Sequence, residues 1–221
     1  MRLRHIPGSE DFVRRASATV NEPERYRGKW SAFFQEDAPL ALEIGMGKGR
    51  FLRELSAREP GWNFLGLERY ASVLQKAIER KEREEREQGK KERENLFFLW
   101  EDAKRLTEIF APGEVARIYL NFSDPWPKAG HAMRRLTSRE FLKLYDAVLA
   151  PKGEIWFKPD NDGLFAWSLE EIPAAGWTLE AVTRDLHGEV GPEDNVMTEY
   201  EQKFSSRGQK ISRLIATRKK L

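Results

Sequence analysis

The sequence of 221 residues contains no cysteine and only three histidines. Without thiols the chain can form neither a disulfide framework nor a thiolate zinc site, and His5, His131 and His187 are too scattered to have the spacing of metal ligands. We therefore expect no metal and a reducing, cytoplasmic location. Long apolar runs and a signal-peptide core are also missing, so we expect a soluble, unprocessed protein without a membrane span.

A strong net charge is missing as well, because 38 basic and 36 acidic residues leave only +2. Two basic clusters stand out, namely Lys128, Arg134, Arg135 and Arg139, and then Lys203, Arg207, Lys210, Arg213, Arg218, Lys219 and Lys220. Local positive fields attract polyanions, although basic tails are also common in soluble proteins. The charge pattern alone leaves nucleic-acid binding open.

Short apolar runs alternate with helical patterns from residue 40 onward. Strands are predicted at 40–44, 62–67, 96–100, 115–122, 153–158, 177–184 and 210–217. Helices are predicted at 50–58, after 67, at 138–149 and at 161–174. This alternation predicts an α/β fold with a mostly parallel sheet and right-handed crossovers.

Three segments fall outside this alternation. Residues 1–38 lack clean periodicity and are predicted to form an arm that packs on, or reaches out from, the main domain at 39–221. Residues 79–94 are almost entirely charged or Gln and indicate a solvated helix. The connection at 185–208 is longer than most, and such loops are often functional.

The first predicted strand runs into glycines at alternate positions, Gly45, Gly47 and Gly49. Glycine lets the backbone turn tightly while a ligand lies against it. A dinucleotide-binding Rossmann site would need another glycine where Arg50 stands. The spacing therefore favours S-adenosylmethionine over NAD.

Acidic residues follow the next two strands. Glu68 lies about twenty residues past the glycines, where a carboxylate can accept both ribose hydroxyls, whereas the plain alternative is a helix-capping surface residue. Asp102 follows the third strand and would bond the adenine amine, with N-capping of a helix as the alternative.

The fourth strand leads into Asn121-Phe122-Ser123-Asp124-Pro125-Trp126-Pro127-Lys128. Two prolines that bracket a tryptophan can neither continue a strand nor enter a helix interior. The segment is therefore predicted to be a stiff loop at the carboxyl end of the sheet, where open α/β folds bind ligands.

In four blocks the sequence resembles the bacterial tRNA (guanine-N7)-methyltransferases, the TrmB family. The blocks are 42–51, 121–136, 157–161, and 198–204 with Gly208, and the resemblance extends from about residue 28 to the end. The segment from Asn121 to Lys128 and the Thr-Glu-Tyr-Glu segment at 198–201 are specific to that family, whereas many methyltransferases share the glycine loop.

The resemblance implies a class I (Rossmann-like) S-adenosylmethionine methyltransferase with a seven-stranded sheet, helices on both faces, and methylation of guanine N7 at tRNA position 46. The matching positions that would line the cofactor are Glu43, Gly45, Gly47, Gly49, Glu68, Asp102 and Asp124. Asp124 would also be catalytic. The tRNA would contact Lys128, Arg134, Arg135, Asp160, Thr198, Glu199, Tyr200 and Glu201.

The chain departs from the family pattern after Lys128. Ala129, Gly130 and Met133 stand where further basic residues are usual, so the loop is expected to grip RNA more weakly. Pro159 replaces a common threonine, and little effect on Asp160 is expected.

Guanine N7 carries an in-plane lone pair and no proton, so its methylation needs no obligatory base. Orientation supplies roughly 7 to 11 kcal/mol in such reactions, and the charge of Asp124 would offset the positive charge that develops on the purine. Trp126 or Tyr200 would stack on the base, with ordinary packing as the alternative.

Features of the sequence disfavour three other functions. An amino-methyltransferase would need two adjacent prolines in this loop, but the segment Ser123-Asp124-Pro125-Trp126 contains a single proline. The joint presence of Glu43, Glu68 and Asp124 disfavours a noncatalytic RNA-binding protein, and Arg50 disfavours an NAD-dependent oxidoreductase. The sequence leaves open whether the protein is a monomer or a homodimer.

Overall fold

A computed structural model describes residues 5–88, 95–191 and 195–219. The strands are β1 (Leu40–Ile44), β2 (Asn63–Leu67), β3 (Leu96–Leu99), β4 (Val115–Asn121), β5 (Leu149–Lys158), β6 (Trp177–Thr183) and β7 (Arg213–Arg218). They form a seven-stranded sheet in the order β3-β2-β1-β4-β5-β7-β6. The predicted α/β fold with a mostly parallel sheet is confirmed.

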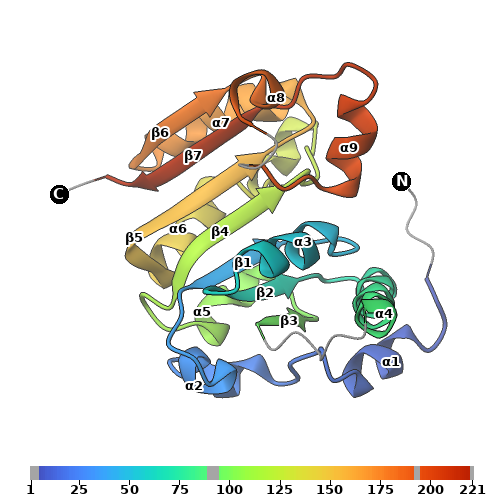
Figure 1. Ribbon diagram of the computed structural model, residues 1–221. Helices are drawn as coiled ribbons and strands as arrows, with labels where there is room; N and C mark the ends of the chain where they lie inside the picture. The colour runs from blue at the N-terminus through green and yellow to red at the C-terminus, as the bar shows by residue number, and fades with distance from the viewer. Residues whose placement is uncertain (1–4, 89–94, 192–194, 220–221) are drawn as a thin grey trace. The chain divides into compact units, whose positions relative to one another are not determined.

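The chain divides into two compact units, one ending at Phe110 and the other beginning at Ala111. In the first unit, β1 pairs in parallel with β2, and β2 pairs in parallel with β3 (Figure 1). Every residue of β1 and β2 is buried, which agrees with their nearly continuous apolar sequences. The helices of this unit are α1 (Ser9–Arg15), α2 (Trp30–Phe34), α3 (Arg50–Arg58), α4 (Ala71–Gln88) and α5 (Leu106–Ile109), with 3₁₀ turns η1 (Pro23–Tyr26) and η2 (Ala103–Arg105).

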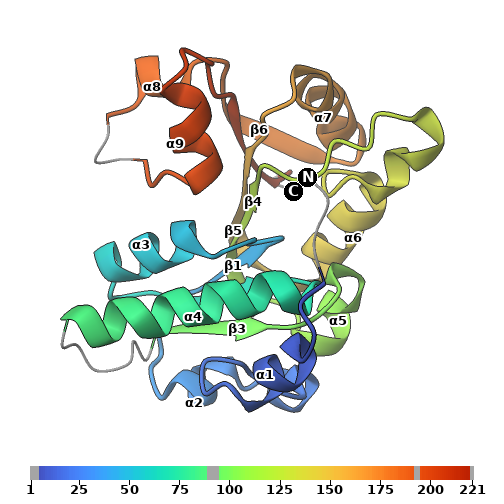
Figure 2. The same ribbon diagram turned by 90° about the vertical axis from the view of Figure 1, so that its right-hand side faces the viewer.

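The N-terminal segment packs on the first unit and contains α1, η1 and α2. Helix α1 lies beside α4 (Figure 2), and the Ile6 amide donates to Ser72 Oγ at 2.8 Å. Beyond α1, Val20 and Phe98 are joined by a backbone hydrogen bond of 2.9 Å. The indole of Trp30 is buried and donates to the Ile109 carbonyl at 3.1 Å. Of the two arrangements expected for this arm, packing on the domain is therefore observed.

The charged segment after residue 78 is less exposed than the sequence indicated. Lys81 and Glu85 are 4% and 8% exposed and form an ion pair of 2.8 Å. Arg53 on α3 pairs with Glu84 at 2.9 Å. The pair between Arg53 and Glu84 therefore joins α4 to α3. Residues 89–94 lie outside the described part of the chain, as do Arg2, Arg4 and Lys220.

In the second unit, β4 and β5 are parallel, and β7 is antiparallel to both β5 and β6. Its helices are α6 (Arg139–Val148), α7 (Asp162–Ala174), α8 (Leu186–Glu189) and α9 (Glu199–Ser205), with the 3₁₀ turn η3 (Ala129–Arg134). Strand β5 begins earlier than predicted, because Leu149 already pairs with Val115 across a register shift. The long connection predicted at 185–208 carries α8 and α9.

Candidate functional site

The glycine loop follows β1 and is fixed at its base by backbone hydrogen bonds. The Gly45 amide donates to the Leu67 carbonyl at 2.8 Å. Gly45, Gly47 and Gly49 have φ angles of +74°, +57° and +69°, a region that side chains disfavour. Among the described residues other than its chain neighbours, a Cβ on Gly45 or Gly47 would meet no atom within 4 Å. The loop therefore presents bare backbone to open space.

Glu68 follows β2 and binds the same loop. Its carboxylate accepts hydrogen bonds from the Gly47 amide at 3.2 Å and from the Tyr70 amide at 3.0 Å. The residue is only 6% exposed. Burial raises the pKa of Glu68 above its ordinary value, while hydrogen bonds from the backbone of Tyr70, Gly47 and Arg69 lower it in part.

The glycine loop requires a glycine at position 66, which was not predicted from the sequence. A Cβ there would lie 2.1 Å from Met46 Sδ and 2.8 Å from Leu52 Cδ1. Met46 belongs to the glycine loop and is buried. The glycine in β2 thus makes room for the loop that follows β1.

Glu43 and Asp102 occupy contrasting environments. Glu43 lies within β1 and is 2% exposed. Asp102 is exposed and accepts a hydrogen bond from the Lys104 amide at 2.9 Å, so it caps η2. The N-capping alternative for Asp102 is therefore observed, and one of its carboxylate oxygens makes that contact.

The residues of the first unit fit S-adenosylmethionine by their chemistry. A carboxylate offers about four acceptor sites, and the backbone hydrogen bonds to Glu68 leave acceptor capacity for a ribose hydroxyl. The uncovered backbone at Gly45 and Gly47 allows a ligand to approach closely.

In the second unit, Asp124 lies in a strained loop. Phe122 and Trp126 on either side of it have φ angles of +53° and +42°, which are unusual for bulky residues. The Phe122 amide donates to the Lys158 carbonyl at 2.7 Å, which ties the loop to the end of β5. The Asp124 side chain is exposed. Such strain is typical of functional loops.

The three basic residues predicted to contact phosphate differ in their surroundings. Lys128 is exposed. The guanidinium of Arg134 lies 5.1 Å from the ring centroid of Trp126. Arg135 donates to the carbonyls of Pro125 and Trp126, at 3.1 Å each, so its guanidinium holds the loop from inside the protein.

The Thr-Glu-Tyr-Glu segment begins α9 and forms a capping box. Thr198 Oγ1 accepts from the Glu201 amide at 2.9 Å, and the Glu201 carboxylate accepts in return from the Thr198 amide. Glu199 is half-buried, and Glu201 is fully buried. The segment therefore has a structural role, whose sequence signature is Thr198 followed three residues later by Glu201, beside the substrate contact predicted for it.

Tyr200 connects α9 with the loops after β4 and β5. Its ring centroid lies 5.2 Å from that of Phe122 and 4.1 Å from that of Phe204. Burial raises the pKa of Tyr200, and a hydrogen bond with the Asp160 carboxylate raises it further. Since Asn121 and Lys158 are paired at the ends of β4 and β5, these strands deliver the Asp124 loop and Asp160 to the same edge.

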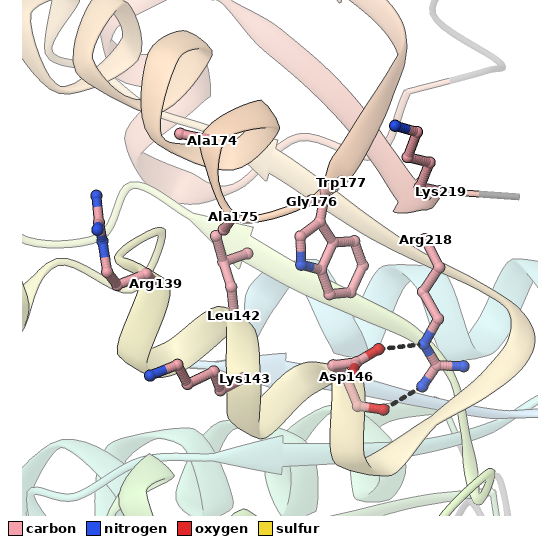
Figure 3. Close-up of a pocket in the computed structure, with 10 residues that line it drawn as sticks. All are labelled: Arg139, Leu142, Lys143, Asp146, Ala174, Ala175, Gly176, Trp177, Arg218 and Lys219. Atoms are coloured by element: carbon pink, nitrogen blue, oxygen red, sulfur yellow. Dashed lines mark hydrogen bonds and ion pairs between the residues drawn. The ribbon is translucent and has the colours of Figure 1, made fainter. Parts of the chain in front are cut away.

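A cavity of about 590 Å³ lies elsewhere in the second unit, near the start of β6 and the end of β7 (Figure 3). Its lining residues are Arg139, Leu142, Lys143, Asp146, Ala174, Ala175, Gly176, Trp177, Arg218 and Lys219. Arg218 pairs with Asp146 at 2.6 Å, and Arg139 pairs with Glu171 at 2.8 Å. The arginines are thus engaged within the protein, and none of the predicted site residues lines this cavity.

Within the ranges 5–88, 95–191 and 195–219, no cluster of three or more His, Asp or Glu side chains is arranged to hold a metal ion. None of the helices in those ranges is both long and apolar enough to cross a membrane.

Comparison with known proteins identifies the family. A family model described as putative methyltransferase matches residues 37–214. A tRNA (guanine-N(7)-)-methyltransferase from Lachnoclostridium phytofermentans is 50% identical over 220 residues, which cover 100% of both chains. The chain belongs to this methyltransferase family. A tRNA (guanine-N(7)-)-methyltransferase from Bacillus subtilis is 44% identical over 96% of this chain and 97% of the relative. The predicted family is confirmed.

Solved structures support the fold class at low sequence identity. The 16S rRNA methyltransferase KamB has a TM-score of 0.63 and 18% identity, over 87% of this chain and 94% of that one. A variant of the 16S rRNA (adenine(1408)-N(1))-methyltransferase of Catenulisporales acidiphilia, solved with cosubstrate SAM, has a TM-score of 0.60 and 16% identity, over 91% and 93% of the two chains. Family and fold together confirm S-adenosylmethionine as the cofactor.

Proposed function

We propose that this protein transfers a methyl group from S-adenosylmethionine to N7 of guanine in tRNA, at position 46 of the variable loop. The observation that supports this reaction is the full-length identity of 50% to a tRNA (guanine-N(7)-)-methyltransferase. The position in the tRNA is a finer proposal, and it rests on the family-specific segments Asn121–Lys128 and Thr198–Glu201.

The first unit holds the methyl donor in this proposal. S-adenosylmethionine, when bound, supplies the reactive methyl group on its sulfonium sulfur. The backbone of Gly45 and Gly47 allows its close approach, and Glu68 accepts hydrogen bonds from the ribose hydroxyls. Glu43, Gly49 and Asp102 are the other members of the proposed cofactor set in this unit, with Asp102 directed at the adenine amine.

The second unit recognises the guanine. Asp124 accepts hydrogen bonds from the guanine edge and offsets the positive charge that arrives on the purine. Tyr200 offers a partly exposed ring for stacking, and Asp160 orients its hydroxyl. Lys128 and Arg134 bind phosphate, and Glu199 flanks Tyr200 on α9.

The test is methylation of an unmodified tRNA transcript, followed by digestion to nucleosides. We expect 7-methylguanosine from the parent transcript and none when guanosine 46 is replaced by adenosine. Product from both transcripts would retain the reaction and reject the position. Methyl transfer to another nucleoside would overturn the reaction itself, and tRNA binding without any methyl transfer would favour a noncatalytic RNA-binding protein.

A further inference from the structure

The carboxylate of Glu201 is fully buried and surrounded by four hydrogen-bonding groups. Oε2 accepts from Lys158 Nζ at 2.8 Å and from the Thr198 amide at 3.4 Å. Oε1 accepts from Asn195 Nδ2 at 2.6 Å and lies 3.1 Å from His187 Nε2. A carboxylate has about four acceptor sites. Three of these groups donate hydrogen bonds to the carboxylate and the residue is 0% exposed, so the Glu201 side chain is committed to contacts within the protein.

The ion pair joins α9 to the central strands of the second unit. Lys158 is the last residue of β5 and is 5% exposed. Its ammonium group also donates to the Val196 carbonyl at 3.0 Å and to Asn195 Oδ1 at 3.2 Å. The segment that leads into α9 is therefore held to the end of β5 by the same lysine.

Tyr200, which precedes Glu201, faces outward. Tyr200 is 41% exposed, and its ring lies against Phe122, two residues before Asp124. Because neighbouring residues on a helix point in different directions, fixing Glu201 inside the protein sets the direction of Tyr200.

We infer that Lys158 and Glu201 are positioning residues, which fix α9 so that Tyr200 stays against Phe122 and Asp160. Glu201 therefore acts on Tyr200 through α9. The effect on methyl transfer rests on the proposed function, whereas the placement of Tyr200 does not.

Removal of one member of a buried ion pair leaves an uncompensated charge inside the protein, which is destabilising. Removal of both members leaves no buried charge, so this cost is absent. The decisive variants are Glu201→Gln, Lys158→Met and the double variant. We expect each single variant to slow single-turnover methylation about tenfold or more, and the double variant to recover most of that loss. Cofactor affinity, measured by calorimetry, should stay within about twofold of the parent. Glu170→Gln, at an exposed site on α7, is the matched control.

A second measurement is independent of activity. NMR with selectively labelled tyrosine gives ring signals for the five tyrosines of the full chain. The signal that disappears in Tyr200→Phe is assigned to the Tyr200 ring. The Tyr200 signal should move toward that of free tyrosine in both single variants and return in the double variant. The inference is overturned if the double variant is no faster than Glu201→Gln and its Tyr200 signal stays displaced. A double variant that does not fold also overturns it. A parent that makes no 7-methylguanosine rejects the proposed function instead, and the NMR result then decides the inference alone.

Discussion

The amide of Gly47 donates a hydrogen bond of 3.2 Å to the carboxylate of Glu68, although the two residues are 21 positions apart. This contact connects the glycine loop after β1 with the end of β2. Glu68 consequently shapes the loop, and we propose that it also offers acceptors to the ribose. A substitution at Glu68 should therefore change cofactor binding in two ways, through lost acceptors and through a looser loop.

Glu68→Gln keeps the side-chain size and removes the charge. We expect a loss of cofactor affinity on the order of tenfold to a hundredfold, because hydrogen bonds to charged groups contribute about 1.5 to 3 kcal/mol each. Calorimetric titration with S-adenosylmethionine measures the loss, and Glu59→Gln at an exposed position is the control. Parental affinity in Glu68→Gln would leave Glu68 only a loop-fixing residue.

The raised pKa of Glu68 predicts a pH dependence. Protonation removes acceptor sites, so cofactor affinity should fall with decreasing pH and begin to fall at a less acidic pH than an ordinary glutamate would give. The stability contribution has the opposite sign, because a raised folded-state pKa stabilises the fold at low pH and that contribution is lost as pH rises through it. Calorimetry between about pH 8 and about pH 5 should show the decline in the parent and a flat profile in Glu68→Gln. A parent as flat as the variant would contradict this prediction.

Gly66→Ala should destabilise the first unit, because the new Cβ would overlap Met46 and Leu52. Overpacking of this kind costs typically about 1 to 3 kcal/mol. Urea denaturation should show the loss, and Met46→Ala in the same chain should restore part of it. Gly61→Ala is the matched control, since a Cβ there would meet no atom within 4 Å. Equal stability of the two alanine variants would show that the loop moves aside without cost.

The sequence predicted the elements whose pattern is local and missed those that depend on distant partners. β1 and α3 match their predicted bounds, because a buried apolar run and an amphipathic repeat are visible in a single segment. α1 has only 7 residues and is stabilised by packing on α4, which no local pattern reveals.

The same distinction applies to the site. Glycine spacing and Glu68 were recognisable from sequence, whereas the need for Gly66 appears only when Met46 is placed above it. Lys158 was visible in the sequence, but its burial beside Glu201 comes from the pairing of segments 43 positions apart. A positive charge in a sequence does not tell whether it will meet solvent or a buried carboxylate.

Lys128 and Arg134 should differ from Arg135 in their effect on tRNA binding. Replacement of Lys128 or Arg134 by glutamine should lower the salt slope of binding by about one unit each. Arg135→Gln should instead slow methyl transfer, because its guanidinium holds the carbonyls of Pro125 and Trp126. Filter binding at several salt concentrations, together with single-turnover rates, separates the two effects. A slope change for Arg135→Gln equal to that of Lys128→Gln would assign Arg135 to phosphate.

Asp124 should be the most sensitive position for the chemical step. It is held in a loop with left-handed residues on both sides, so the backbone that carries its carboxylate is constrained before the substrate arrives. Loss of one preorganised electrostatic partner costs roughly a hundredfold to a thousandfold in turnover. Asp124→Ala removes both charge and hydrogen bonding and should lose that much, while Asp124→Asn keeps the size and should lose less. Single-turnover rates at saturating tRNA and cofactor isolate this step, and Asp37→Asn at an exposed position is the control. Rates near the parental value in both Asp124 variants would assign Asp124 a structural role in the loop, since an electrostatic partner of the purine cannot be removed without slowing the transfer.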